Sequence, residues 1–135
     1  MSAPEAALRD VLGAAMEADA TLAAALGQAV RIQRDESRNA AFPYLSWGRC
    51  HARPQNGDGI DLVEIRIDLH IWASESDALT LTGAVRAFID ARSVLDMGPD
   101  YRLVALNTAF SDVLRVRDPR TRRGVLRLRA LIQSL

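Results

Sequence analysis

Hydrophobic and polar residues alternate most regularly between Leu62 and Trp72. The odd-numbered positions hold Val63, Ile65, Ile67, Leu69 and Ile71, and the even-numbered ones hold Glu64, Arg66, Asp68 and His70. Successive side chains of a β-strand point to opposite faces of its sheet, so this segment is predicted to be a strand with one apolar face and one polar face. Trp72 breaks the pattern, because its parity places a large aromatic ring on the polar face.

Two other segments have the apolar spacing of amphipathic helices. The first opens with the capping-box sequence SAPE at residues 2–5, breaks near Ala18–Thr21 and stops at Gly27. Its apolar stripe contains Leu8, Val11, Leu12, Ala15 and Met16. The second helix is predicted to begin with Ser74 as its cap and to end near Arg92. Its stripe contains Ala78, Leu81, Val85, Phe88 and Ile89.

Turn-forming residues divide the rest of the chain into extended segments. Residues 29–35 contain a short predicted strand, and a second strand begins at Phe42. The sequence PQNGDG at residues 54–59 predicts a hairpin that joins this second strand to the alternating strand. Residues 101–110 and 124–132 are two further predicted strands, joined by an irregular basic connection.

The order of these elements is helix, hairpin, helix, hairpin. It predicts an α+β fold with a mainly antiparallel sheet of about four to five strands and two main helices packed on one face, in the order α-β-β-α-β-β. A chain of 135 residues, of which 49% are hydrophobic, is long enough to bury one core. Residues 1–135 are therefore expected to form a single domain.

Membrane insertion and disulfide bonding are not expected. No apolar run approaches the roughly 20 residues that span a bilayer, and the N-terminus lacks a signal-peptide pattern, which predicts synthesis in the cytoplasm. The single cysteine, Cys50, cannot form an internal disulfide. A small buried or half-buried residue is the favoured interpretation of Cys50, and a reactive thiol is the alternative.

The polar row of the alternating strand contains residue types that perform acid–base catalysis. Asp68 and His70 would lie about 7 Å apart on one strand face, which is long for a direct hydrogen bond. A metal site would need further ligands, and the second histidine, His51, would have to meet His70 across the hairpin. We therefore expect a solvated or interface-facing row, with metal binding and catalysis as alternatives.

Charge is distributed unevenly, although the formal net charge is zero. Residues 1–30 carry one arginine and four acidic residues, whereas residues 101–135 carry eight arginines and two acidic residues. The C-terminal cluster contains Arg115, Arg117, Arg120, Arg122 and Arg123, followed by Arg127 and Arg129. We expect the first five, together with Trp72 and His70, to form a subunit interface. Acidic surface on another copy would oppose it, for example around Glu5, Asp10, Glu17 and Asp19.

The cluster is predicted to lie at a hairpin turn. Asp118-Pro119 favours the start of a turn, and Gly124 permits a positive φ at its end, so the arginines between them should project outward. These arginines are Arg120, Arg122 and Arg123. Nucleic-acid binding is the alternative function of the cluster, but no aromatic residue follows Phe110, and a chain without net charge attracts DNA weakly.

Several segments, taken together and in this order, resemble one known family. They are ALRDVLGAAMEADATLAAALG at residues 7–27, FPYLSWG at 42–48, DLHIWASESDALTLTGAVRAFID at 68–90, RLVALNTAF at 102–110 and RDPRTRRGVLRLRAL at 117–131. The likeness covers nearly the whole chain. The sequence resembles the tail terminator and head–tail connector family encoded in the tail modules of siphophages, prophages and gene transfer agents.

The resemblance implies a structural virion protein with no catalytic residues. No cofactor or metal is expected, since the sequence contains no GxGxxG, P-loop or HExxH motif. It implies a tail terminator that forms a ring, usually of six subunits, at the head–tail junction of a particle assembled in the bacterial cytoplasm. Such a ring caps the tail tube protein and joins it to the head–tail connector, or stopper, while DNA passes through without specific binding. Another neck component, either a stopper or an adaptor, and a nucleic-acid-binding module are the alternatives.

Overall fold

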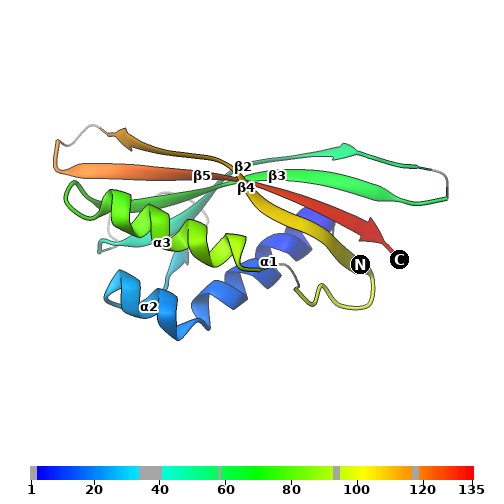
Figure 1. Cartoon of the computed structure of the whole chain (residues 1–135), viewed down its shortest axis with the longest axis horizontal. Helices are drawn as coiled ribbons and strands as arrows, with labels where there is room; N and C mark the ends of the chain where they lie inside the picture. The colour runs from blue at the N-terminus through cyan, green and yellow to red at the C-terminus, as the bar shows by residue number, and fades with distance from the viewer. Residues whose placement is uncertain (1–2, 34–40, 58, 93–94, 117–118) are drawn as a thin grey trace.

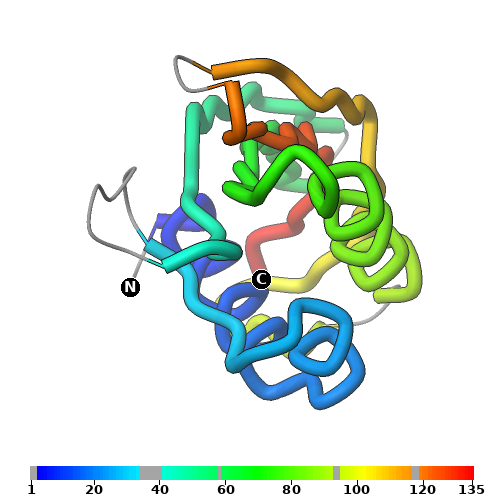
Figure 2. The backbone as a smooth tube through the Cα atoms, turned by 90° about the vertical axis from the view of Figure 1, so that its left-hand side faces the viewer, coloured from blue at the N-terminus to red at the C-terminus, as the bar shows by residue number. Residues whose placement is uncertain are grey.

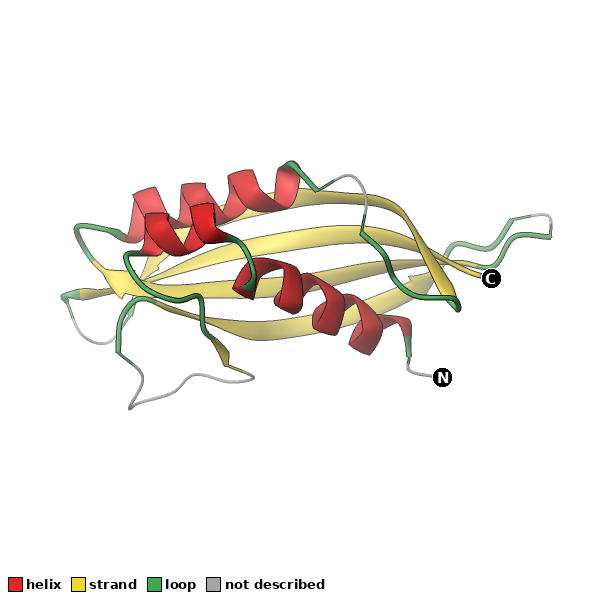
Figure 3. Cartoon of the chain, turned by 90° about the horizontal axis from the view of Figure 1, so that it is seen from below, coloured by secondary structure: helices red, strands yellow, loops and turns green. Residues whose placement is uncertain are grey.

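Three helices and five strands form two layers in the computed structural model, which describes residues 3–33, 41–57, 59–92, 95–116 and 119–135. The helices are α1 (Pro4–Glu17), α2 (Ala20–Leu26) and α3 (Ala78–Asp90). The strands are β1 (Ile32–Gln33), β2 (Tyr44–Pro54), β3 (Leu62–Ser74), β4 (Tyr101–Arg115) and β5 (Thr121–Ser134). All three helices lie on one face of the sheet (Figures 1 and 3).

The sheet has the strand order β1-β2-β3-β5-β4. β1 runs parallel to β2, and every other neighbouring pair is antiparallel. The two hairpins, β2–β3 and β4–β5, extend toward opposite ends of the molecule (Figure 1). The predicted α+β class and element order are confirmed, with β1 as the short strand expected within residues 29–35.

The core lies between the sheet and the helices. The apolar row of β3 faces this core, and four of its members are 0–2% exposed: Ile65, Ile67, Leu69 and Ile71. The alternating residues of β5 predicted to be apolar are also fully buried: Leu126, Leu128, Ala130 and Ile132. Helices α1 and α3 contribute Leu8, Leu12, Met16, Val85 and Ile89, each 0% exposed. The end-on view in Figure 2 shows α1 and α2 covering the same side of the sheet.

The predicted break in the first helical segment is confirmed. The Asp19 side chain caps α2 by accepting a hydrogen bond from Thr21 N at 3.4 Å, and Gly27 ends this helix in the left-handed region with φ 75°. The predicted capping box begins at Ser2, which lies outside the described residues. None of the helices in the described part of the chain is long and apolar enough to cross a membrane.

Two predicted boundaries are wrong because strand pairing extends further than the sequence pattern indicates. Ser74 ends β3, where it is paired with Thr121, and helix α3 begins one turn later with Asp77 at its N-cap position. The supposed irregular connection after residue 110 is mostly sheet. β4 continues to Arg115, which pairs with Arg122 of β5.

Gly124 lies within β5, so the predicted positive φ at the end of a turn is wrong. Among the described residues, positive φ angles occur at Gly27, Gly59 and Gly98. Gly124 instead permits the close approach of α3, because a Cβ at this position would lie 3.2 Å from Thr82 Cβ. A contact that short would displace the helix or the Thr82 side chain.

Candidate assembly surface

None of the helices in the described ranges lies on the second face of the sheet, and we call it the helix-free face. It is the upper side of the sheet in Figure 1. The polar row of β3 lies on it, as the alternation predicts, and the strand register places side chains of β2, β5 and β4 beside that row. The face therefore combines residues that are far apart in the sequence.

The two carboxylates of this row are buried beneath arginines. Glu64 accepts hydrogen bonds from Arg66 Nε and Arg129 Nε, each at 3.0 Å, and its side chain is 9% exposed. Asp68 accepts from Arg127 Nε at 3.0 Å and from Arg127 Nη2 at 3.4 Å, and its side chain is 12% exposed. The hydrogen bond from Arg66 is the largest cause that lowers the pKa of Glu64, and Asp68 raises the pKa of Arg127. Both acids are thus occupied by ion pairs, which is poor geometry for a general base.

The two histidines do not meet across the β2–β3 hairpin. His70 pairs with Ser46, and His51 pairs with Arg66. A Cβ at Gly48 would lie 2.7 Å from His70 Nε2, so the imidazole packs over the glycine backbone. Within the ranges that the structure describes, no three His, Cys, Asp or Glu side chains are grouped closely enough to hold a metal ion. The pairing required by the metal-binding alternative is therefore wrong.

Trp72 lies on the helix-free face, as its parity predicts, but it is only 4% exposed. Its Nε1 donates a hydrogen bond to Ser46 Oγ at 2.9 Å, and its ring stacks on Tyr44 with centroids 6.0 Å apart. Tyr44 in turn stacks on Phe42, which is 44% exposed. Arg123 lies over the indole, with Cζ 5.6 Å from the ring centroid. The tryptophan therefore anchors an aromatic stack and does not itself present a free surface.

The C-terminal arginines do not form one outward-facing cluster. Arg122 folds back onto the chain, where Nη2 lies 3.2 Å from Glu75 Oε1 and Nη1 donates to Pro119 O at 2.7 Å. Neighbouring residues of a strand point to opposite faces, so Arg123 turns to the other side and covers Trp72. The prediction that Arg122 and Arg123 project outward is thus wrong. Arg115 and Arg120 are exposed, and Arg117 lies outside the described residues.

Two exposed apolar residues of β4 are not indicated by the sequence pattern. Phe110 is 47% exposed and Leu114 is 36% exposed, and both lie on the helix-free face of the edge strand. Irregularities between Leu103 and Ala105 and between Thr108 and Phe110 shift the strand register. These shifts hide the alternation, which otherwise would have indicated an apolar row at the sheet edge.

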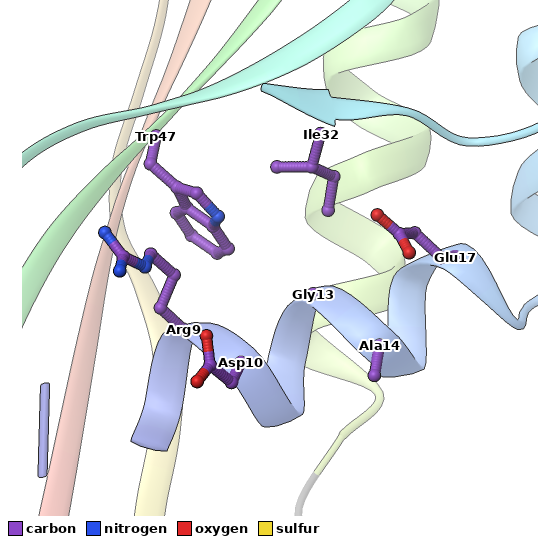
Figure 4. Close-up of a pocket in the computed structure, with 7 residues that line it drawn as sticks. All are labelled: Arg9, Asp10, Gly13, Ala14, Glu17, Ile32 and Trp47. Atoms are coloured by element: carbon purple, nitrogen blue, oxygen red, sulfur yellow. The ribbon is translucent and has the colours of Figure 1, made fainter. Parts of the chain in front are cut away.

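The helical side carries a shallow hollow of ≈ 260 Å³ between α1 and strands β1 and β2 (Figure 4). It is lined by Arg9, Asp10, Gly13, Ala14, Glu17, Ile32 and Trp47. Arg9 extends from α1 toward the indole of Trp47 (Figure 4). Arg9, Asp10 and Glu17 are its charged residues, and all three belong to α1.

Cys50 is exposed, so its predicted burial is wrong. Partial desolvation is the largest cause that raises the pKa of its thiol; Glu5 adds to the increase and Arg9 opposes it. A raised pKa leaves less of the reactive thiolate at neutral pH. The geometry therefore gives no support to the alternative of an activated thiol.

Comparisons with known proteins agree with a role in assembly. The family described as "Tail completion protein gp17" matches residues 10–133. A chain from a solved structure titled "Virion of native gene transfer agent (GTA) particle" is similar, with 26% sequence identity and a TM-score of 0.73 over 98% of this chain and 99% of that chain. No protein with a curated description matches the sequence. The chain therefore belongs to the tail completion protein gp17 family and is a structural protein of a phage-type tail.

Proposed function

We propose that the protein is a tail terminator, which forms a ring of six copies, caps the tail tube and joins it to the head connector. Its family and its similarity to a chain of a gene transfer agent virion support a place in the tail. The single observation that supports ring formation is the exposed edge of the sheet. This edge needs a partner that the described part of one copy does not supply.

The two edges of the sheet differ, which favours a head-to-tail contact. β4 forms one edge and displays Phe110 and Leu114. At the other edge β1 pairs with β2 only at Leu45 and Ser46, which leaves the outer side of β2 without a strand from Trp47 onward in the described residues. Long open edges invite pairing with another chain, and contacts between unlike surfaces form a ring when the rotation between successive copies closes.

A change of the apolar edge tests this proposal. The double variant Phe110→Asp and Leu114→Asp should keep the fold, because both residues are partly exposed, yet it should abolish ring formation and completed tails. Native mass spectrometry of the purified chain with tail tubes measures ring formation, and electron microscopy of particles counts completed tails.

Leu79→Asp is the matched control, since Leu79 is 76% exposed on α3, which lies on the opposite face of the sheet from Phe110 and Leu114. It should assemble as the wild type does. If the double variant also assembles normally, the β4 edge is not the subunit contact. Labelling of the chain in intact particles separates a terminator, found at the end of the tail tube, from a stopper or adaptor found only on the head side.

A further inference from the structure

Arginines from all four long strands gather on one part of the helix-free face. We call this group the cationic field, and it consists of Arg49, Arg53, Arg66, Arg102, Arg127 and Arg129. His51 lies beside it, and its carboxylates are Glu64 and Asp68. Six arginines against two acids leave the field strongly positive. The sequence does not reveal it, because the strand order brings residues 49–53 near residues 127–129.

The field is layered, with its negative charge below its positive charge. The side chains of Glu64 and Asp68 are 9% and 12% exposed. The arginines that cover them remain open to solvent: Arg66 is 41%, Arg127 43% and Arg129 33% exposed in their side chains. A molecule that approaches this face therefore meets guanidinium groups first. The buried carboxylates hold these groups in place.

Three members of the field have no carboxylate partner among the described residues: Arg49, Arg53 and Arg102. All three are exposed. Arg49 also lines a polar hollow of ≈ 120 Å³ together with His51, Arg66, Asp68 and Arg127. The hollow places several N–H donors around one small space, as an oxyanion requires.

A phosphate backbone fits this field better than a protein surface does. The cores of protein interfaces are depleted of charge. Two exposed apolar residues of this face lie outside the field: Phe110 at its border, beside Arg127, and Leu114 beyond it. Four neighbouring strands about 4.8 Å apart give the field a width of about 14 Å. Along each strand, successive side chains on this face are about 6.6 Å apart. Several phosphates of one nucleic-acid strand can contact such a surface at once.

We propose that the cationic field contacts the phosphate backbone of double-stranded DNA without reading its sequence. Arg49, Arg53 and Arg102 supply free charge, and the ion-paired arginines supply further donors. The choice of duplex DNA among polyanions rests on the proposed function, because a ring between head and tail surrounds the path of the genome. The expected contact is salt-sensitive, which suits DNA that must move past the surface.

Titration of the full chain with a labelled duplex of random sequence tests the proposal. The variant with Arg49→Gln, Arg53→Gln and Arg102→Gln should bind more weakly, and the slope of log K against log salt should fall by about 0.9 for each phosphate that no longer meets an arginine. Arg86→Gln is the control, since Arg86 is exposed on α3 on the opposite side of the sheet. It should leave both affinity and slope unchanged. Circular dichroism checks that all variants are folded.

The outcomes separate this inference from the proposed function. Equal affinity and slope for the triple variant and the wild type would overturn the DNA contact, whatever the state of assembly. Loss of ring formation in the triple variant, with no DNA binding by the wild-type ring, would also overturn it and assign the field to an acidic surface of a neighbouring protein. DNA binding through the field by a chain that never joins a tail tube would support the contact and refute the terminator.

Discussion

At the scale of single residues, the ion pairs of Glu64 make the stability of the fold depend on pH. Hydrogen bonds from Arg66 and Arg129 lower its pKa below the ordinary value of 4.5. A lowered pKa in the folded state contributes stability above the ordinary value, and this stability disappears as the pH falls through the folded value. The fold should therefore weaken on acidification below about pH 4.5.

Glu64→Gln tests this dependence. The variant cannot be protonated at residue 64, so its free energy of unfolding should fall less steeply in acid than that of the wild type. Arg66→Gln removes the largest cause of the lowered pKa, so its free energy of unfolding should also fall less steeply in acid than that of the wild type. Urea unfolding measured at a series of pH values gives the slopes. If the free energy of unfolding falls equally steeply with decreasing pH in all three proteins, the ion pairs of Glu64 do not cause the dependence.

At the scale of elements, the contact between α3 and β5 depends on Gly124. A Cβ there would meet Thr82, whose Oγ1 is buried without a hydrogen-bond partner among the described residues. Gly124→Ala should reduce the free energy of unfolding by about 1–3 kcal/mol, the usual cost of overpacking a core. Thr82→Ala in the same chain should recover most of this stability, because the two residues share one space.

Urea denaturation of the two single variants and the double variant measures this coupling. Gly57→Ala is the matched control, since no atom lies within 4 Å of a Cβ built at that position. It should change stability by much less than Gly124→Ala. Additive effects of Gly124→Ala and Thr82→Ala would contradict a direct contact between the helix and the strand.

The elements can be predicted from the sequence wherever one face of a segment is uniformly buried. β3 and the second half of β5 are such segments, and their buried rows agree with the alternation. The predicted β4 is too short, because two irregularities interrupt its pattern and its outer residues face solvent. The predicted start of α3 is one turn too early, since Ser74 satisfies a capping pattern while the backbone still pairs in the sheet.

The candidate surface is less predictable, because it depends on the register between strands that are distant in the sequence. The sequence groups Arg122 and Arg123 together, yet the strand sends one to Glu75 and the other to Trp72. It separates Arg53 from Arg129, yet the sheet places both near Glu64. Periodicity defines a face of one strand, whereas cross-strand pairing decides which faces combine.

At the scale of the whole molecule, positive and negative charge are segregated between surfaces. The α1–α2 segment carries Glu5, Asp10, Glu17 and Asp19 against a single arginine, Arg9. The exposed arginines of the β4–β5 hairpin, Arg115 and Arg120, lie where this hairpin forms one end of the molecule (Figure 1). Surfaces of opposite charge on one chain favour contacts between unlike sides of successive copies.

We therefore expect Arg115→Glu with Arg120→Glu to impair assembly while leaving the fold intact. Exposed ion pairs contribute about 0–1 kcal/mol to stability, whereas truncation of an arginine desolvated at an interface can cost about 2 kcal/mol or more. Thermal melting should be nearly unchanged, and the number of completed tails should fall at least tenfold. Arg86→Glu on α3 is the control and should affect neither.

A charge exchange identifies the partner surface of the hairpin. Asp10→Arg with Glu17→Arg in the same chain should restore assembly, because each copy then offers an acidic hairpin to a basic α1 of its neighbour. Counting of tailed particles by electron microscopy measures the recovery. If the variant with Arg115→Glu and Arg120→Glu alone still assembles normally, the hairpin is a solvated loop. If it fails and the exchange does not rescue it, the hairpin contacts a different protein of the tail or neck.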